Sequence, residues 1–424
     1  EEHHKVGYEC SAAPRERYRI RVGWGQIRES AAMAALGVCV GGAADVRGVR
    51  ASAARGPSSR APAPPVRAAA AERRATIASP AAIALNAWGS SRGLVAVPPC
   101  AVARPRGSQP AVTCAGAHAP GSCGPVLSGC GSAVPSHELT NEDLAALVDT
   151  SDEWIASRTG ISSRRIISGN ETLTGLAAEA STKALEMAGV DASEVDLVIM
   201  ATSSPDDAFG NACLVQAAIG AKKAVAFDLT AACSGFVMAT VTGCQYIRAG
   251  AYKTVLVIGA DALSRYVDWT DRSTCILFGD GAGAVVLQAK EGQDNLLGFD
   301  LRSDGAGNRH LTCAFDSKGN KSQSADPSVS GSFDNIAMSG GDVFKFAVRA
   351  VPQVLKGAMK NASVGIEDVD WLVLHQANQR ILDSAADRMG VPHEKVVTNL
   401  KKYGNTSAAS IPLALDEAVR AELI

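Results

Sequence analysis

Hydrophobic and polar positions from about residue 125 onward form a pattern that occurs twice along the chain. In the first copy, the helical spacing of LAAEASTKALEMAGV precedes a polar turn and an apolar strand pattern at residues 195–200. In the second copy, FAVRAVPQVLKGAMKNASV precedes a turn and the equivalent strand pattern at residues 369–374. Short apolar runs bounded by turn residues are typical of strands buried in a sheet that helices cover.

A second strand is predicted in each copy, AVAFDLT in the first and KVVTNL in the second. Each leads through small residues into another helix. Helices and apolar strands that alternate in this way, twice, predict an α/β fold of two similar halves packed face to face, with buried helices between the sheets. We assign residues 125–290 to the N-terminal half and residues 291–424 to the C-terminal half.

The second copy is shorter than the first. After Cys233 the first copy continues with a strand, TVLVIGA, and a strand-turn-strand pattern, CILFGDGAGAVVLQ, whereas only nineteen residues follow Asn405. We therefore expect a truncated C-terminal half that lacks its last two strands. The Gly-x-Gly-x-Gly run within CILFGDGAGAVVLQ is flanked by strand patterns, so we interpret it as a tight hairpin with positive φ angles and close packing, not as a dinucleotide fingerprint.

The charge of the first 124 residues differs from that of the rest. They hold sixteen Lys and Arg against seven Asp and Glu, whereas residues 125–424 hold twenty-five against thirty-six. An acidic body argues against nucleic acid as a partner. No charge-free run of eighteen apolar residues occurs, which argues against a membrane-spanning helix.

The basic leader divides at Met33, because the chain begins with Glu and this is its first methionine. We interpret residues 1–32 as upstream, non-native sequence. Residues 33–124 contain ten Arg, no Lys and two acidic residues, which is typical of a disordered organelle transit peptide. A disordered tail without a targeting role is the alternative.

Six of the eleven cysteines lie in the body, and no pair has a spacing that indicates a zinc site or a disulfide framework. We expect a reducing compartment, no metal site, and five cysteines that act as small buried hydrophobes. Cys233 is the exception, since it follows a predicted strand and begins the helical pattern SGFVMATVTGCQYIRAG. Unpaired N–H groups and the helix dipole favour a nucleophilic thiolate there; an inert core cysteine is the alternative.

Two further residues are candidates for the same site. His375 ends a predicted strand in LVLHQAN, and open α/β sheets bind ligands at the carboxyl ends of their strands. Cys233 lies 37 residues after Asp196 and Asn405 lies 35 residues after Asp370, so equivalent turns of the two copies present a cysteine and an asparagine. We expect the three side chains to converge on one cleft. The alternatives are a structural histidine and a capping asparagine.

Six stretches resemble the β-ketoacyl-acyl carrier protein synthase III family in its plastid form, and together they run along nearly the whole body. They are VDTSDEWIASRTGI, DLTAACSGF, ADALSRYVDWTDR, ILFGDGAGAV, LVLHQANQRI and YGNTSAASIPLALDEAV. The resemblance implies a duplicated thiolase-like fold, a homodimer in the chloroplast stroma, and a catalytic triad of Cys233, His375 and Asn405. Chains of this family continue past LDEAV into a Gly-rich loop and a final strand, and Ser273 stands where they usually have Gly.

The resemblance also implies the reaction and its substrates. Acetyl-CoA would acetylate the cysteine, and malonyl-acyl carrier protein would then condense to acetoacetyl-acyl carrier protein with release of CO2, without a cofactor or metal. Four residues match positions that contact CoA: Trp154, Arg158, Arg272 and Asn378. Two match basic positions that meet the acidic carrier protein: Lys345 and Arg380.

Three other functions remain open at this point. A type III polyketide synthase-like enzyme shares the fold and the triad, although its surroundings of the histidine and asparagine differ. A papain-like thiol hydrolase uses the same three residue types but needs the C-G-[SA]-C-[WY] signature, which is absent. A non-catalytic, truncated scaffold that only binds carrier protein is the third.

Overall fold

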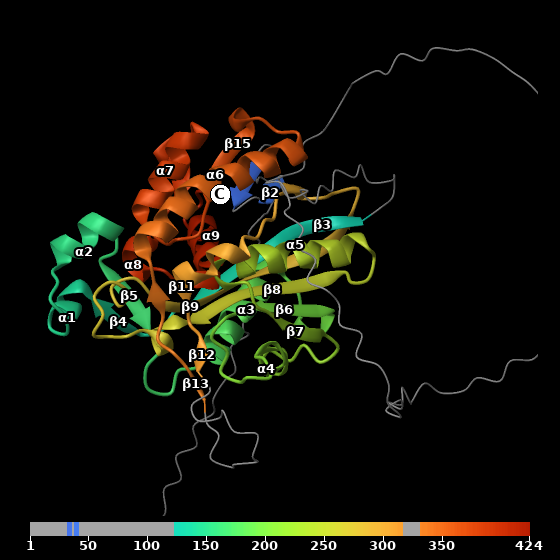
Figure 1. Ribbon diagram of the computed structural model, residues 1–424. Helices are drawn as coiled ribbons and strands as arrows, with labels where there is room; N and C mark the ends of the chain where they lie inside the picture. The colour runs from blue at the N-terminus through green and yellow to red at the C-terminus, as the bar shows by residue number, and fades with distance from the viewer. Residues whose placement is uncertain (1–31, 36–37, 42–122, 317–330) are drawn as a thin grey trace, which may run out of the picture. The chain divides into compact units, whose positions relative to one another are not determined.

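Two five-stranded sheets with corresponding strand arrangements account for the repeated pattern (Figure 1). The structure is a computed structural model, and it describes residues 32–35, 38–41, 123–316 and 331–424. The predicted duplicated α/β fold is confirmed.

The first sheet has the strand order β3-β9-β8-β6-β7. Its strands are β3 (Cys123–Ala133), β9 (Asp280–Glu291), β8 (Thr254–Ala262), β6 (Leu197–Ala201) and β7 (Val225–Leu229). Strands β8, β6 and β7 are parallel, and β9 runs antiparallel to β8 and β3. Every residue of β6 and β8 is buried, which explains their continuous apolar sequences, since helices cover both faces of the sheet.

The second sheet has the order β10-β2-β1-β15-β16. Its strands are β10 (Leu296–Phe299), β2 (Val38–Gly41), β1 (Ala32–Ala35), β15 (Val369–Val373) and β16 (Val396–Val397). Strand β1 is parallel to β15, and β2 is antiparallel to both β1 and β10. Strands β1 and β2 therefore hold the places that β8 and β9 hold in the first sheet.

Strands β1 and β2 bear on two expectations. The stretch 33–124 was expected to be unstructured throughout, which is wrong for 33–35, for 38–41 and for 123–124, where β3 begins. The second half was expected to be truncated and to lack its last two strands. Among the described residues, no strand follows Asn405, and β1 and β2 take the two places between β10 and β15. The physical reason is that β10 and β15 present unpaired N–H and C=O groups on facing edges, and a pair of strands satisfies both.

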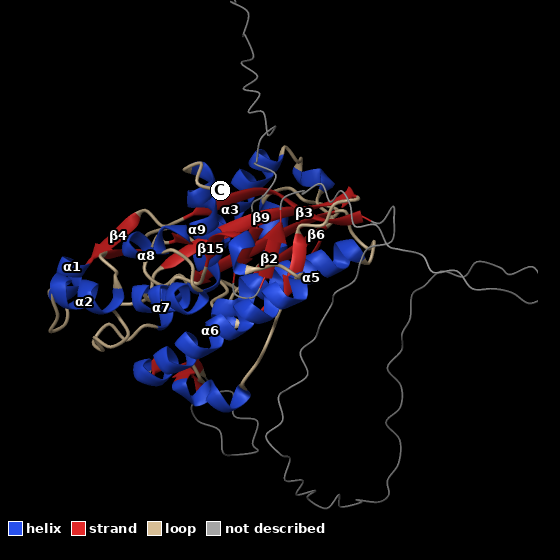
Figure 2. Ribbon diagram, turned by 90° about the horizontal axis from the view of Figure 1, so that it is seen from above, coloured by secondary structure: helices blue, strands red, loops and turns tan. Residues whose placement is uncertain are grey.

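Helices separate and cover the two sheets (Figure 2). Helices α5 (Gly235–Arg248) and α9 (Ser410–Arg420) contact strands of both sheets, α5 against β8 and β10, and α9 against β9 and β15. The outer side of the first sheet packs on α3 (Leu173–Ala188) and α4 (Ala212–Ala218), and the second sheet packs on α6 (Gly340–Ala362) and α7 (Gln379–Met389). Nine residues of α5 are buried, so the prediction of a deeply buried helix is confirmed.

Alternate side chains of β6 pack into two different hydrophobic cores, one on each face of the first sheet. Leu197, Ile199 and Ala201 belong to the inner core with residues of α5, whereas Val198 and Met200 belong to the outer core with residues of α3. Successive side chains of a strand point to opposite faces. The inner core also contains residues of the second sheet, so it joins the two halves.

The remaining elements are short. They are α1 (Asn141–Ala145), α2 (Asp152–Thr159), α8 (Leu400–Tyr403) and the antiparallel pairs β4 (His137–Thr140) with β5 (Ser163–Ile166), β11 (Leu311–Thr312) with β14 (Ala337–Met338), and β12 (Phe315–Asp316) with β13 (Ser332–Phe333). Helix α2 contacts α7, and β5 contacts α8, so this group borders the second half (Figure 1).

The glycine-rich run does not form the predicted hairpin. Its glycines lie at the start of the single strand β9 or just before it, and none of Gly279, Gly281 and Gly283 has a positive φ. The predicted close packing is confirmed, because a Cβ on Gly283 would lie 2.7 Å from the Cβ of Pro412. Glycine here lets α9 approach the backbone of the sheet.

The seven cysteines within residues 123–316 are free thiols. Of the five body cysteines predicted to be buried, Cys130, Cys244 and Cys275 are buried, whereas Cys213 is exposed and Cys313 is half-buried. The prediction is wrong for these two, because α4 faces the core with its other positions and Cys313 lies in an open loop region. Residues 1–31 and 42–122, which hold most of the predicted leader, lie outside the described residues. Within the described part, no helix is long and apolar enough to cross a membrane.

Candidate active site

Cys233 lies in the connection between β7 and α5. A single 3₁₀ turn, η2 (Ala232–Ser234), carries it, and α5 begins directly afterwards. Ala232 has a φ of +46°, a conformation that residues with a side chain rarely adopt unless their surroundings hold them there. Cys233 is half-buried while Ala232 and Ser234 are exposed. Part of Cys233 therefore meets solvent at the start of a buried helix.

The protonation of Cys233 differs from the prediction. Burial raises the pKa of its thiol to about 11, and the hydrogen bond from Ser407, which favours the thiolate, does not offset this. The desolvation comes from the protein packed around the sulfur, although part of the residue still meets solvent. The expected resting thiolate is therefore wrong, because desolvation outweighs the helix N-terminus, and the group at pH 7 is a thiol.

Asn405 lies in the corresponding connection of the second half. Its N–H donates to the carbonyl of Leu277 (2.8 Å) and its carbonyl accepts the N–H of Gly279 (3.0 Å), which ties it to the first half. The side-chain Oδ1 accepts the N–H of Ser407 at 2.9 Å. Only the oxygen of a carboxamide can accept from an N–H, so this bond fixes Nδ2 as the end that points away from the turn.

The two turns have the same local shape. Cys233 is the middle residue of η2, and Ala408 is the middle residue of η7 (Ser407–Ala409), which leads directly into α9. Ser407 has a φ of +50°, as Ala232 has +46°. The prediction of equivalent turns is confirmed, but Asn405 lies three residues before the counterpart of Cys233. Spacing counted from the strands missed this, because α8 lies between β16 and the second turn.

The cysteine turn and the asparagine turn contact each other. Ser407 of η7 lies beside Cys233 of η2. A Cβ on Gly235 would lie 3.7 Å from the Cβ of Ala408, and a Cβ on Gly259 would lie 2.2 Å from the Ala408 carbonyl oxygen. Glycine at 259 therefore permits an approach that any other residue would block. The structure thus brings the two candidate segments together across the halves.

His375 lies two residues beyond the end of β15, as predicted. Val373, the last residue of that strand, shares the inner core with Phe236 of α5 and Ala408 of η7, so all three segments border one core. Burial lowers the pKa of His375 to about 4. Its Nδ1 is buried and has no hydrogen-bond partner within the described part of the chain. The imidazole is therefore neutral at pH 7 and carries one N–H donor.

Trp154 lies on α2 and is approached by two guanidinium groups. The Cζ of Arg158 lies 4.3 Å from the ring centroid, and the Cζ of Arg272 lies 5.1 Å from it. Arg272 also donates to the backbone carbonyl of Asp149 at 2.6 Å. Two cations over one indole make a flat site suited to an aromatic or phosphorylated ligand.

The other three predicted binding residues continue from this cluster onto α6 and α7. Asn378 caps α7 by accepting the N–H of Arg380, and its Nδ2 donates to the carbonyl of Arg158 at 3.1 Å. The guanidinium of Arg380 lies 5.4 Å from the ring of Phe344, which precedes Lys345 on α6. Lys345 is exposed and pairs weakly with Asp342. The six residues thus form a chain of neighbours along one region, while Asn378 has a clear capping role.

Sequence reasoning missed two residues of this site. Ser407 lies in the turn that contacts the turn of Cys233, and Asp261 is fully buried and accepts the N–H of Ala408 in that same turn. Asp261 could have been found from the sequence, because it is an acidic residue at the end of the otherwise apolar strand TVLVIGADA. A carboxylate in a buried strand needs hydrogen-bond donors. Among the described residues, no group of three or more His, Cys, Asp or Glu side chains could hold a metal ion.

Family models, similar sequences and solved structures all indicate one protein family. The chain matches the family models described as 3-oxoacyl-[acyl-carrier-protein] synthase III, over residues 227–305, and its C-terminal counterpart, over residues 359–424. It is 58% identical over 300 residues to the beta-ketoacyl-[acyl-carrier-protein] synthase III of Synechococcus elongatus, covering 70% of this chain and 89% of that protein. It is 56% identical over 304 residues to the chloroplastic protein of that name from Arabidopsis thaliana, covering 69% and 75%.

Solved structures agree with these relatives. The 3-oxoacyl-[acyl-carrier-protein] synthase III of Aquifex aeolicus has a TM-score of 0.65 and 44% identity, covering 71% of this chain and 92% of that one. The corresponding enzyme of Pseudomonas aeruginosa has a TM-score of 0.64 and 39% identity, covering 71% and 90%.

Proposed function

Because the chain belongs to the β-ketoacyl-acyl carrier protein synthase III family, the condensing acyltransferases that initiate fatty-acid synthesis, we propose that Cys233, His375 and Asn405 are its catalytic triad. The observation that supports this most directly is the contact between the turn that carries Cys233 and the turn that follows Asn405. These turns come from opposite halves of the duplication, as a site shared by the two halves requires.

The first step is acetyl transfer from acetyl-CoA. The Cys233 sulfur attacks the acetyl carbonyl carbon, the bond from that carbon to the CoA sulfur breaks, and the proton that the thiol gives up leaves with CoA as a thiol. Backbone N–H groups at the turn, including that of Cys233, would stabilise the tetrahedral oxyanion. A thiol with a pKa of about 11 attacks slowly at rest, so the bound substrate and its surroundings have to assist the loss of the proton.

The second step is decarboxylative condensation. Malonyl-acyl carrier protein loses CO2, and the electrons of the broken carbon–carbon bond form an enolate. A neutral imidazole N–H on His375 and the Nδ2 of Asn405 are suited to donate to that enolate oxygen, and neither needs to remove a proton. The carbanion attacks the acetyl carbon, the carbon–sulfur bond to Cys233 breaks, and the released thiolate takes up one proton.

We propose that CoA binds along the Trp154 cluster. A base stacked between Trp154 and Arg272 needs about 7 Å between them, two van der Waals spacings, whereas the two lie 5.1 Å apart. Arg272 would therefore move outward as the adenine enters, and its exposed position allows this. Arg158 and Asn378 would line the path from there toward Cys233.

Lys345 and Arg380 are proposed to meet the carrier protein. Both are exposed, and they lie on adjacent helices through the contact of Arg380 with Phe344. A cationic area of this kind in an acidic body would attract an acidic partner at the mouth of the CoA path. A homodimer and a plastid location are further expectations. The chloroplastic Arabidopsis relative and the Arg-rich, acid-poor leader support the location.

The experiment that tests the proposal separates the two steps. Incubation with acetyl-CoA followed by mass spectrometry is expected to show an acetyl adduct on Cys233, which Cys233→Ser abolishes. Cys213→Ser is the matched control, because Cys213 is an exposed cysteine of the same half outside the site. His375→Ala and Asn405→Ala are expected to keep the adduct and lose CO2 release from malonyl-acyl carrier protein. An adduct that persists in Cys233→Ser, or is absent from the wild-type chain, would contradict the assignment.

A further inference from the structure

Asp261 is a buried carboxylate that the condensation steps above do not use. It lies next to the last residue of β8 and has no exposed surface. Within the described residues it forms no salt bridge, and burial raises the pKa of its carboxyl group. A charged or polar group in such a position is costly unless hydrogen bonds satisfy it.

Four donors satisfy Asp261. Its Oδ1 accepts the N–H of Ser203 (2.7 Å), the hydroxyl of Ser204 (2.8 Å) and, at longer range, the hydroxyl of Thr202 (3.3 Å). Its Oδ2 accepts the N–H of Ala408 at 3.1 Å. Both oxygens of the carboxyl group therefore accept hydrogen bonds from the protein.

These bonds connect the two halves. The first three donors belong to the loop that follows β6, whereas Ala408 belongs to η7 in the second half and is the counterpart of Cys233. Ser407 precedes Ala408 in this turn, which contacts the turn of Cys233. One side chain thus holds the asparagine turn at the position where that turn meets the nucleophile.

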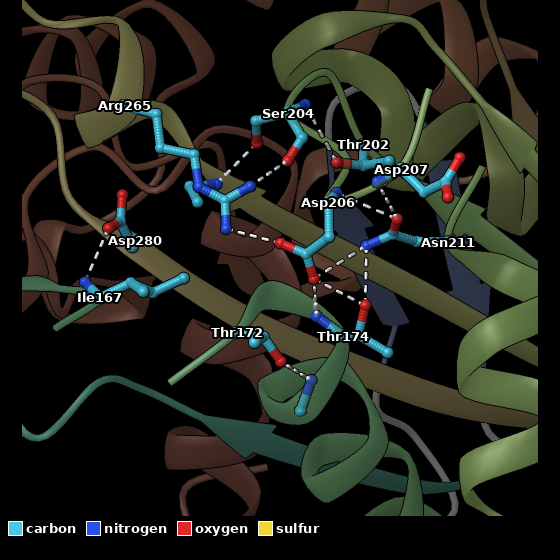
Figure 3. A network of polar contacts seen from close by, with 12 residues as sticks. Ile167, Thr172, Thr174, Thr202, Ser204, Asp206, Asp207, Asn211, Arg265 and Asp280 are labelled. Atoms are coloured by element: carbon cyan, nitrogen blue, oxygen red, sulfur yellow. Dashed lines mark hydrogen bonds and ion pairs between the residues drawn. The ribbon is translucent and has the colours of Figure 1, made fainter. Parts of the chain in front are cut away.

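The loop on the other side of Asp261 is itself held firmly (Figure 3). Arg265 donates to the carbonyl of Ser204 at 3.2 Å and pairs with Asp206. Asp206 also accepts the N–H and hydroxyl of Thr174, and Asn211 donates to that hydroxyl at 3.1 Å. Asp261 is therefore attached to a loop that has several hydrogen bonds of its own. We expect a change at the carboxylate to displace the turn of Ala408 more than this loop.

We propose that Asp261 is a positioning residue for condensation, holding the turn of residues 405–408, and with it the Asn405 carboxamide, against the turn of Cys233. This inference rests on the proposed function. Asp261 is fully buried, so its effect acts through the residues that it contacts, among them Ala408 of the second half. Asparagine at this position would turn an N–H group toward the donor of Ala408 or those of the loop, and the asparagine turn would shift.

The test compares Asp261→Asn with Asp280→Asn. Asp280 is equally buried, lies on the adjacent strand β9, and accepts the N–H of Ile167 and the N–H and hydroxyl of Ser264. In Asp261→Asn, the kcat of condensation is expected to fall by on the order of tenfold to a hundredfold, as for a small misplacement of a catalytic group, while KM for malonyl-acyl carrier protein stays within about twofold of wild type. Asp280→Asn is expected to change both by less than Asp261→Asn does.

A second measurement needs no substrate. The pH profile of Cys233 alkylation by iodoacetamide is expected to move to lower pH in Asp261→Asn, because a negative charge near the sulfur is lost, and to stay unchanged in Asp280→Asn. Besides burial, Ser407, Asp261 and the Cys233 N–H shift the pKa of this thiol, and Asp261 is the charged group among them. If wild-type chain alkylates as expected but forms no acetyl adduct, the proposed function fails and the positioning role is still tested by this profile.

Ser204→Ala provides a milder variant if Asp261→Asn does not fold. It removes one donor to Asp261 and is expected to lower the kcat of condensation in the same direction by a smaller factor. Equal losses in the Asp261 and Asp280 variants, an unchanged alkylation profile in Asp261→Asn, or a loss confined to KM would each overturn the proposal.

Discussion

The carboxamide oxygen of Asn405 accepts the backbone N–H of Ser407 at 2.9 Å, so the Asn405 side chain is held with its NH2 group directed away from its own turn. We predict that Asn405→Asp keeps this bond, because a carboxylate also accepts, but loses the donor needed at the enolate. The decarboxylation rate of malonyl-acyl carrier protein should fall about 10²- to 10³-fold, as when one oxyanion donor is removed. Stopped-flow measurement of CO2 release checks this.

Asn405→Ala is the control for that substitution. It removes the bond to Ser407 as well as the donor, so it should also destabilise the turn and lower the melting temperature, whereas Asn405→Asp should melt near the wild type. An aspartate variant that releases CO2 at the wild-type rate would exclude Asn405 as an enolate donor.

His375 should make stability depend on pH in a specific window. Its pKa is about 4 in the folded chain and near 6.5 when exposed. Between these values the unfolded chain binds more protons, so the free energy of unfolding should fall as pH drops from 6.5 toward 4. His375→Gln should flatten this slope. Urea denaturation at pH 4.5, 5.5 and 6.5 measures it.

His393 offers a control of opposite sign. Its pKa is raised by its bond to Asp387, so the stability it contributes is present below pH 6.5 and is lost as pH rises through its folded pKa. In His393→Gln, the free energy of unfolding should therefore still fall between pH 6.5 and pH 4, as steeply as in the wild type or more so. Identical profiles for His375→Gln and wild type would show that the imidazole is solvated and protonates normally.

Cys233 should alkylate as a buried thiol. With a pKa of about 11 in place of 9.0, its rate with iodoacetamide should keep rising by about tenfold per pH unit through pH 9 to 10, since only the thiolate reacts. The measurement uses the Cys213→Ser background to remove an exposed competitor, and peptide mapping assigns the product. A plateau below pH 8 would instead support the resting thiolate that the helix N-terminus alone predicts.

The sequence predicted the halves and the turns because both depend on local patterns. Short runs such as 195–200 and 369–374 are mostly apolar, and most of their residues are buried. Such a run can be recognised without knowing which residues pack against it. His375 at the end of β15 follows from the same pattern. The two halves, the turns and the position of His375 could therefore be predicted without knowledge of the tertiary contacts.

Features that depend on contacts distant in sequence could not be predicted in this way. The pairing of β1 with β15 joins residues more than three hundred positions apart, and Gly283 is small because α9 lies across it. The thiol of Cys233 is protonated because protein surrounds it, which outweighs the local helix effect. Each outcome is set by tertiary packing, which a single sequence does not display.

Trp154→Ala should weaken the binding of acetyl-CoA without slowing the condensation step. Stacking of a base on an aromatic side chain contributes about 1–3 kcal/mol, so KM for acetyl-CoA should rise by about fivefold or more while kcat changes little. An acetyl thioester of pantetheine, which has no adenine, is the control and should show no difference between the variant and the wild type. Equal losses with both thioesters would place the effect of Trp154 in the packing of α2 rather than in binding of the base.

Strands β1 and β2 should stabilise the second sheet through backbone pairing. Their register places Met33 beside Trp371 and Val40 beside Leu296, so they bridge β15 and β10. Deletion of residues 1–41 should leave both edges unpaired and increase amide hydrogen exchange in 369–373 and 296–299, with a lower melting temperature. Deletion of residues 1–31 is the control and should leave exchange in both strands unchanged. Equal exchange in the two shortened chains would show that the second sheet does not depend on this pairing.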